Sequence, residues 1–172
     1  MELEKIYNDL IKKYTESVKE NVYLEVEARF SDIDKKRFDI LFNYLKSKYK
    51  YEKSEHLDFF KDSIRLTDDK LIEKNRLIWF KLDRFKLVLS EEIKLEKKID
   101  IKQFKKDALK IDKIRYSFKL NEFIVDMTIV DDNKYEIEIE LLTKPTKNLL
   151  TTLYEYVIDY WKIMLNIYNF QV

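Results

Sequence analysis

Residues 22–30 read VYLEVEARF, and this stretch decides the fold. Apolar and polar side chains alternate along it, which predicts a β-strand with two different faces. The polar face carries four residues: Tyr23, Glu25, Glu27 and Arg29. Residues 134–142, KYEIEIELL, repeat this alternation. Their acidic face carries three residues: Glu136, Glu138 and Glu140.

These two acidic strands predict a metal site. Glutamate is uncommon in strands, and carboxylates along one face repel each other. A divalent cation would offset that repulsion, and Mg²⁺ or Mn²⁺ prefers oxygen ligands while keeping water for a substrate. The competing interpretation is that both faces are solvated surfaces of an exposed sheet.

The rest of the chain divides into helical and extended patterns. Helices are expected at 2–19, after a cap at Ser31-Asp32, at 101–110 and from Pro145 onward. Period-two segments bounded by Asn and Asp predict the remaining strands. These segments are 56–61, 62–67, 70–82, 85–99, 113–120 and 122–130.

The pattern predicts a mainly β, α+β protein, expected to form one domain over residues 1–172. About eight strands with one polar and one apolar face fit either an open sheet with a wet face or a closed barrel with a polar lumen. We favour an eight-stranded antiparallel barrel. Helices at the N-terminus, after the first strand and at the C-terminus would then cover its apolar outside.

The composition excludes several kinds of site. Without glycine, the chain has neither a Walker-type loop nor a dinucleotide-binding loop, so side chains or a metal must hold any phosphate. Without cysteine and with one histidine, it has no thiolate or multi-histidine zinc site. We expect that histidine, His56, to be structural. A net charge of +1 lacks the large basic excess of proteins that hold nucleic acid through unspecific phosphate contacts. If the chain acts on RNA, it should therefore recognise something local, such as a chain end, rather than coat a backbone.

The same features bear on location. There is no cysteine, the first residues carry no signal-peptide pattern, and no apolar run approaches the ~20 residues of a membrane span. We therefore expect an intracellular protein without a membrane partner, cytoplasmic or nuclear, including the cytoplasm of a virus-infected cell.

Basic side chains alternate along the other predicted strands. Five of them share faces with Ser, Thr or acidic residues: Arg65, Lys86, Lys113, Arg115 and Lys119. If all polar faces turn inward, the lumen has a carboxylate wall and a basic wall. Such a lumen suits a triphosphate, whose terminal phosphoryl would meet the metal while cations grip the other phosphates.

In this order, the motifs resemble those of the metal-dependent RNA triphosphatases of fungi, protists and large DNA viruses, within the triphosphate tunnel metalloenzymes. The resemblance covers about residues 22–142 and rests on EVEARF, SIRLT, KLVLSEE, RYSF with VDMTIV, and EIEIE. It implies an eight-stranded tunnel that removes the γ-phosphate from 5′-triphosphate RNA, the first step of mRNA capping. It also implies metal-dependent hydrolysis of free nucleoside triphosphates.

The resemblance implies roles for individual residues. The metal ligands would be Glu25, Glu27, Glu136, Glu138 and Glu140. The catalytic group would comprise Glu92, which orients the attacking water, with Arg65, Lys86 and Arg115. Further substrate-binding residues would be Arg29, Lys74, Lys113, Lys119 and Asp126. Ile124 stands where the family often has a basic residue, and Lys119 or Lys74 is expected to replace that contact.

Two other functions remain open at this point. The same tunnel could hydrolyse inorganic triphosphate or another small triphosphate. In a different class, a non-catalytic barrel could bind a polyanion or serve as the partner subunit of a capping enzyme. The chain shows no guanylyltransferase or methyltransferase pattern, so those activities would belong to separate partners; the oligomeric state stays open.

Overall fold

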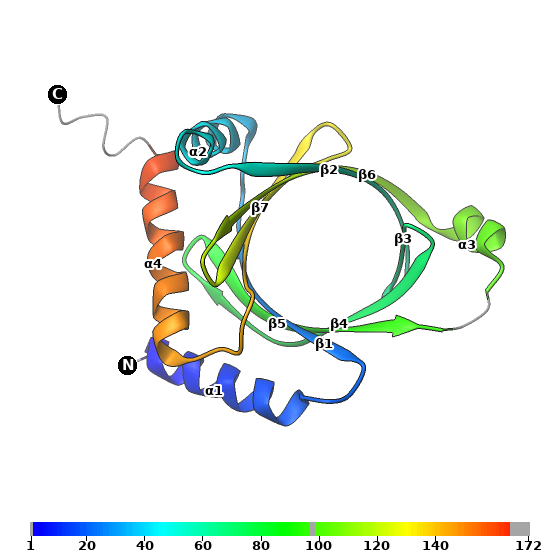
Figure 1. Ribbon diagram of the computed structural model, residues 1–172, viewed down its shortest axis with the longest axis horizontal. Coiled ribbons are helices and arrows are strands. Elements are labelled where there is room, and N and C mark those ends of the chain that lie inside the picture. Colours follow the sequence, from blue (N-terminus) through cyan, green and yellow to red (C-terminus); the bar gives the residue numbers. More distant parts are fainter. Residues whose placement is uncertain (1, 97–98, 166–172) are drawn as a thin grey trace.

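The computed structural model describes residues 2–96 and 99–165. Eight antiparallel strands in this part close a barrel in the order β1-β5-β4-β3-β2-β6-β7-β8 (Figure 1). The strands are β1 (Val22–Phe30), β2 (Tyr51–Lys61), β3 (Ile64–Thr67), β4 (Lys70–Leu82), β5 (Phe85–Leu95), β6 (Leu109–Leu120), β7 (Phe123–Val130) and β8 (Lys134–Leu141). The helices are α1 (Glu2–Ser17), α2 (Lys35–Lys48), α3 (Ile101–Asp107) and α4 (Lys147–Met164). The predicted fold class is confirmed.

The barrel closes where its first and last strands meet. β1 pairs with β5 on one side and with β8 on the other, so neither edge of the sheet is left open. In the β1–β8 register, Glu27 lies opposite Glu140 and Arg29 lies opposite Glu138. Residues directly opposite each other in an antiparallel pair share a face. The two acidic strands therefore present their carboxylates side by side to the lumen.

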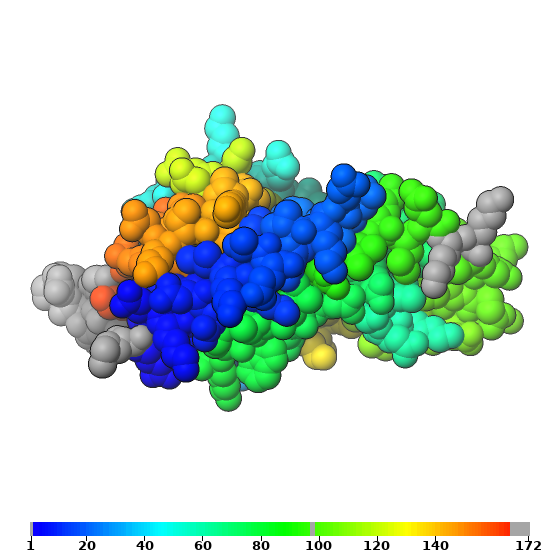
Figure 2. Space-filling view, turned by 90° about the horizontal axis from the view of Figure 1, so that it is seen from below, coloured from blue at the N-terminus to red at the C-terminus, as the bar shows by residue number. Residues whose placement is uncertain are grey.

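The apolar faces of the strands point outward, against the helices. Val26 of β1, Leu89 of β5 and Ile139 of β8 are at most 1% exposed, although they lie on the outside of the barrel. Helices α1, α2 and α4 gather on that side, while α3 lies across the barrel from them (Figure 1). Figure 2 shows α1 crossing the outer surface of the molecule. Among the described residues, no helix is long and apolar enough to cross a membrane.

The hairpins turn without glycine. Positive φ values occur at nine described positions: Asn21, Asp32, Asp62, Asp68, Asp69, Arg84, Asn121, Asp131 and Asp132. Eight of the nine are Asn or Asp, whose short side chains tolerate the left-handed region. The exception is Arg84 in the β4–β5 turn, whose guanidinium carbon lies 5.4 Å from the centre of the Trp161 ring. That cation–π contact helps to hold an otherwise unfavourable turn.

Several predicted boundaries are wrong. Helix α2 is capped by Asp34, which accepts from the Arg37 amide, while Asp32 has φ 53° and forms a turn instead of a cap. Strand β2 begins at Tyr51, before the predicted start, because exposed charged residues mask its alternation. Helix α3 ends at Asp107, and the next strand begins earlier than predicted. Residues 97–98 of the predicted 85–99 strand lie outside the described residues.

Burial between barrel and helices generates a stability prediction. Leu41 of α2 is fully buried, so Leu41→Ala leaves a cavity and is expected to lower the free energy of unfolding by about 2–5 kcal/mol. Leu57 on the outside of β2 is 42% exposed, and Leu57→Ala is the matched control, with an expected change below about 1 kcal/mol. Urea denaturation followed by circular dichroism measures both. Equal losses would contradict the outward-facing core.

Candidate functional site

The lumen contains a cavity of about 520 Å³, to which every strand contributes. Its size is typical of a ligand site. Twelve of the residues predicted for the site line it: Glu25, Glu27, Arg29, Arg65, Lys74, Glu92, Lys113, Arg115, Asp126, Glu136, Glu138 and Glu140. The alternation of each strand therefore brings most of the predicted site together.

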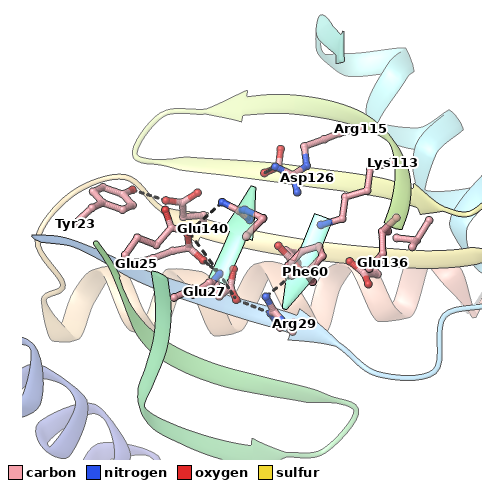
Figure 3. A pocket seen from close by; sticks show the side chains of 16 residues that line it. Tyr23, Glu25, Glu27, Arg29, Phe60, Lys113, Arg115, Asp126, Glu136 and Glu140 are labelled. Carbon is pink, nitrogen blue, oxygen red and sulfur yellow. Dashed lines mark hydrogen bonds and ion pairs between the residues drawn. The ribbon is translucent and has the colours of Figure 1, made fainter. Parts of the chain in front are cut away.

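One wall of this cavity is acidic. Glu25 and Glu27 come from β1, and Glu138 and Glu140 come from the adjacent β8. Figure 3 shows Glu25, Glu27 and Glu140 close to one another, with the Tyr23 hydroxyl donating a hydrogen bond to Glu140. The side chain of Glu27 is only 2% exposed, so its charge is largely removed from water.

Cations lie among these carboxylates. The Lys74 ammonium of β4 is 2.8 Å from Glu25 Oε1 and 3.9 Å from Glu27 Oε1. Arg29 contacts Glu27 and lies 3.4 Å from Glu138 Oε1. Each buried carboxylate of β1 thus has a charged partner, as burial requires.

Glu92 of β5 occupies a separate position on the cavity wall. Its Oε1 atom lies 3.6 Å from Arg65 Nη2 and 3.9 Å from the Lys74 ammonium. A carboxylate held between two cations is fixed in orientation while keeping access to the cavity. This arrangement can position a water molecule or accept a proton.

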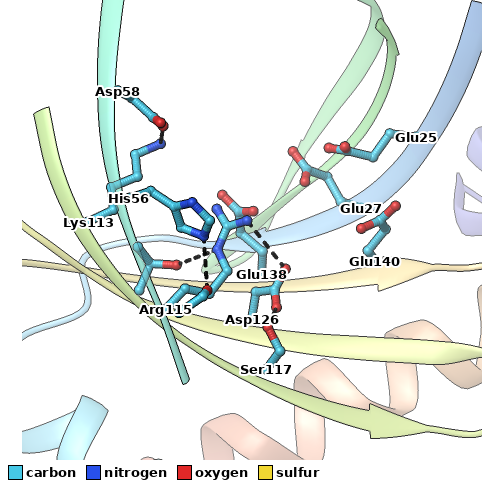
Figure 4. Close-up of polar contacts among 12 residues, drawn as sticks. Glu25, Glu27, His56, Asp58, Lys113, Arg115, Ser117, Asp126, Glu138 and Glu140 are labelled. Carbon is cyan, nitrogen blue, oxygen red and sulfur yellow. Dashed lines mark hydrogen bonds and ion pairs between the residues drawn. The ribbon is translucent and has the colours of Figure 1, made fainter. Parts of the chain in front are cut away.

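A second cluster lies on β6 and β7. Arg115 Nε donates to Thr128 Oγ1 at 3.2 Å, and one of its terminal nitrogens is 4.0 Å from Asp126. Asp126 also accepts a hydrogen bond from Ser117. In Figure 4, Arg115 and Lys113 lie apart from Glu25, Glu27 and Glu140. The lumen therefore has the acidic and basic sides that the sequence predicted, although each side contains some opposite charge.

Lys113 extends this cluster toward β2. Its ammonium is 3.3 Å from the buried Asp58 and 5.1 Å from the centre of the Phe60 ring. Asp58 also accepts from Thr67 at 2.7 Å. Lys113 is consequently tied to the wall by a carboxylate and an aromatic face.

Burial and like charges shift the ionisation of the carboxylates. Burial, reinforced by Glu138 and Glu25, raises the pKa of Glu27 well above its ordinary value. The pKa of Glu25 is lowered. Burial alone would raise it, but the hydrogen bond with Glu27 and the positive charge of Lys74 outweigh burial. Burial, with the charges of Glu25 and Asp126, raises the pKa of Glu140 to about 7. The carboxyl groups of β1 and β8 therefore disfavour being ionised all at once, because they are buried close to one another.

The donor chemistry of the cavity fits a divalent cation. Its described lining has seven carboxyl groups and five Lys or Arg residues, an excess of two acidic side chains. The carboxylate oxygens are the ligands that Mg²⁺ and Mn²⁺ prefer. In the described arrangement, no three acidic or histidine side chains lie close enough together to hold a metal. Their oxygens contact Lys74, Arg29 and Tyr23 instead, so metal binding requires those contacts to exchange.

Two predicted residues lie outside this cavity. Lys86 is on the lumenal face of β5, opposite Arg29, but its ammonium lies 5.6 Å from the ring centre of Trp79, beyond the cavity lining. Lys119 is exposed near the end of β6, opposite Ile124. The sequence gives the face of each lysine correctly but not its height along the barrel. Of the two lysines expected to replace the contact missing at Ile124, Lys74 lines the cavity and Lys119 does not.

The prediction missed other residues of the lumen. Tyr23 and Phe60 line the cavity, and Asp58 anchors Lys113. His56, expected to be structural, lies opposite Lys113 and is hydrogen-bonded to Ser54 at 2.9 Å. The period-two alternation of β2 could have placed all three β2 residues on the lumenal face. Phe60 gave no signal because aromatic residues are common in strands, and Asp58 gave none because it is a lone carboxylate rather than one of a row.

The raised pKa values predict how stability depends on pH in the metal-free protein. A carboxyl group whose pKa is higher in the folded state binds more protons there than in the unfolded state, so its contribution to stability is lost as the pH rises. For Glu140 this loss runs from about pH 4.5 through pH 7, and for Glu27 it continues to higher pH. Glu27→Gln should flatten this decline and stabilise the protein at pH 8 by at least about 1 kcal/mol. Glu55→Gln, with a side chain 72% exposed, is the control. Denaturant titrations in chelator from pH 5 to 9 measure the effect, and parallel curves for all three proteins would contradict it.

Known structures share this architecture. The RNA triphosphatase domain of the trifunctional mimivirus mRNA capping enzyme is 20% identical, with a TM-score of 0.68, over 92% of this chain and 97% of that one. The S. pombe RNA triphosphatase Pct1, solved with the Spt5 CTD, is 15% identical, with a TM-score of 0.62, over 97% and 89%. PH1819 from Pyrococcus horikoshii is 14% identical, with a TM-score of 0.51, over 82% and 90%.

Sequence comparison alone does not reveal these similarities. No protein-family profile and no curated protein sequence matches the chain. At identities of 14–20%, the similarity establishes the fold and leaves the chemistry to be argued from the cavity. The resemblance inferred from the ordered strand motifs is thus confirmed at the level of architecture: the chain has the tunnel fold of the capping-type RNA triphosphatases.

Proposed function

We propose that this protein is a metal-dependent RNA 5′-triphosphatase, which hydrolyses the γ-phosphate of 5′-triphosphate RNA and leaves a 5′-diphosphate end. The observation that carries the proposal is the cavity inside the closed barrel, where β1 and β8 contribute carboxylates and β3, β4 and β6 contribute cations. The similarity in fold to RNA triphosphatases of mRNA capping supports it. The reaction would be the first step of cap formation.

The cations of the cavity would hold the phosphates. Arg65, Lys74 and Arg115 come from three different strands and line one cavity. Their separate origins let them surround a polyphosphate chain instead of contacting it from one side. Charge-assisted hydrogen bonds to phosphate oxygens are stronger than neutral ones, and Arg can make two at once. Because the chain has no glycine, these side chains take the part that backbone amides play in phosphate-binding loops.

The acidic wall would hold Mg²⁺ or Mn²⁺ through Glu25, Glu27, Glu138 and Glu140, with Glu136 in support. When bound, such an ion supplies Lewis-acid stabilisation of the charge that develops on the phosphoryl oxygens. Its charge would also match the excess of two carboxylates in the cavity lining. The ion is not specified by the residues, since both cations accept the same oxygen donors.

The hydrolytic step also needs a group that orients water and takes its proton. Glu92 would take this role; its contacts with Arg65 and Lys74 on two sides and its exposure to the cavity support the assignment. Asp126 would orient Arg115 toward the substrate through their contact at 4.0 Å. In this proposal the cations bind the phosphates, Glu92 accepts the proton of the attacking water, and the acidic wall binds the metal.

We further propose that the protein acts inside the cell and that separate guanylyltransferase and methyltransferase partners complete the cap. The triphosphatase reaction leaves a diphosphate end, which is the acceptor that guanylyl transfer requires. The main rival is a tunnel that acts on inorganic triphosphate or another small triphosphate, because the same cations and carboxylates would serve it.

A substrate panel tests the reaction. The purified protein is expected to release γ-phosphate from a 5′-triphosphate oligoribonucleotide only with Mg²⁺ or Mn²⁺, and chelator should stop the release. The RNA should have a higher kcat/KM than ATP or inorganic triphosphate. A preference for inorganic triphosphate would support the rival, and binding without hydrolysis in either metal would indicate a non-catalytic barrel.

Removal of a wall carboxylate tests the site. Glu27→Ala and Glu138→Ala are each expected to lower kcat by at least about 100-fold, because each removes a group proposed to stabilise the reacting phosphoryl through the metal. Glu55→Ala on the outside of β2 is the matched control and should keep wild-type turnover. Circular dichroism verifies that the variants are folded. Full activity in both lumenal variants would refute the assignment.

A further inference from the structure

The β4–β5 hairpin extends past the point where its neighbour stops. Strand β3 pairs with β4 only from Lys70 to Glu73, after which the Lys74 amide makes one more bond to Ser63. From Asn75 to Leu82, β5 is the only described strand that pairs with β4. The lumenal face of this extension is therefore not bordered by β3, and Arg76, Trp79 and Lys81 on it are exposed.

An aromatic residue and two lysines lie on that face. The register pairs Trp79 with Val88 and Lys81 with Lys86, and Val88 lines the lumen. A β-bulge between Arg76 and Ile78 shifts the alternation of β4 by one residue, so Trp79 and Lys81 lie on the same face as Arg76. Trp79 is 50% exposed, which is unusual for so large an apolar side chain. The Lys86 ammonium lies 5.6 Å from its ring centre.

The lysines belong to a row of cations across three strands. Arg29 of β1 lies opposite Lys86 of β5, which lies opposite Lys81 of β4. Like charges directly opposite each other in a sheet are destabilising. Among the described residues, no carboxylate lies within the 4.0 Å ion-pair distance of Lys81 or Lys86. An anionic ligand would relieve the repulsion in this row.

The row is continuous with the proposed phosphate site. A second cavity, of about 280 Å³, opens between the main cavity and the extension. Arg29, Arg65 and Lys74 line both cavities, and Arg76 is added in the second, where Asp62 is the only carboxylate among the described lining residues. The charge of the lining thus changes from acidic at the β1–β8 wall to basic along the way to Trp79. A polyanion would follow this path outward from the metal site.

We propose that the open face of the β4–β5 hairpin binds the nucleotides that follow the 5′-triphosphate of the RNA substrate. Trp79 stacks on a base, while Lys81 and Lys86 contact backbone phosphates. Basic residues next to an exposed aromatic are the combination by which proteins hold single-stranded nucleic acid without sequence preference. Trp79 lies five positions after Lys74 along the strand, about 17 Å at ~3.3 Å per residue, so the two serve different parts of the substrate.

This inference rests on the proposed function, and it assigns the preference for RNA to a place outside the triphosphate cavity. A small triphosphate held near Lys74 would not reach Trp79. The hairpin face thus raises the affinity for a polynucleotide without changing the chemistry of the cavity. An acidic peptide is the other class of ligand that such a row of cations could take, but it gives no reason for the exposed indole.

Trp79→Ala tests the inference. Loss of base stacking is expected to raise KM for a 5′-triphosphate oligoribonucleotide by roughly 5- to 100-fold, while kcat/KM for inorganic triphosphate stays at the wild-type value. Binding of a 5′-diphosphate oligoribonucleotide, followed by fluorescence anisotropy, should weaken by a similar factor and needs no turnover. Trp79→Phe, which keeps an aromatic face, should recover most of the affinity. Tyr49→Ala, which removes an aromatic residue 39% exposed at the end of α2, is the control.

Salt dependence supplies a second, independent readout. Lys81→Ala should reduce the slope of log affinity against log salt for the same oligoribonucleotide by about 0.7, because one phosphate contact is lost. Lys53→Ala on the outside of β2 removes an equal charge away from the hairpin and should leave the slope unchanged. Thermal melting verifies that each variant is folded.

The outcomes separate the two proposals. If RNA is hydrolysed but Trp79→Ala binds and hydrolyses it like the wild type, the hairpin inference is overturned and the proposed function stands. Equal losses for RNA and inorganic triphosphate also overturn the inference, because they indicate damage to the cavity. If the wild type hydrolyses inorganic triphosphate but not RNA, the proposed function fails, and the inference fails with it. Displacement of the oligoribonucleotide by an acidic peptide of equal charge at similar affinity would contradict recognition through stacking.

Discussion

The pairing of β1 with β8 is the interaction on which the rest of the structure depends. It joins strands from opposite ends of the described chain, closes the barrel, and sets Glu27 opposite Glu140 on the lumenal face. Two carboxylates in that position repel each other, and the burial of Glu27 intensifies the repulsion. The protein meets this cost with Lys74 and Arg29, which contact the acidic wall from β4 and β1. Such a wall does not contribute to stability, since apolar residues of similar size would fill the inside of a small barrel without the free-energy penalty of burying charges.

Keeping the lumen polar determines where the core must lie. The hydrophobic core forms between the outside of the barrel and helices α1, α2 and α4, with Leu10, Leu41 and Val157 fully buried there. Stability and chemistry therefore use opposite faces of the same strands. Because successive side chains point to opposite sides, the sequence of each strand satisfies both demands at once. The lumen can hold charged groups that are unfavourable for folding because the outer layer supplies the compensating burial.

Alternation explains how far the sequence could lead. In β1 and β8 the polar and apolar residues alternate without exception, so the strand bounds and the inward-facing glutamates were predicted almost residue by residue. The height of a residue along the barrel depends on strand tilt and stagger, which alternation does not contain. Lys86 and Lys119 therefore do not line the main cavity, although their place in the alternation suggested that they would. The bulge after Arg76 interrupts the pattern and concealed the inward position of Trp79. Lys74, which contacts Glu25 and Glu27 of β1, lies on β4, and β5 separates these two strands in the sheet. A contact between strands that are not neighbours cannot be read from a local sequence pattern.

The central claim is that carboxylates from two strands distant in sequence act together on one divalent cation. Anomalous diffraction from crystals grown with Mn²⁺ tests it most directly, because the signal locates the ion without reference to activity. The account predicts a single strong peak in the lumen, with oxygens of at least one glutamate from β1 and one from β8 as ligands, and Lys74 displaced from Glu25. A lumen without a peak at millimolar Mn²⁺, or a peak bound only by residues on the outer surface, would contradict it.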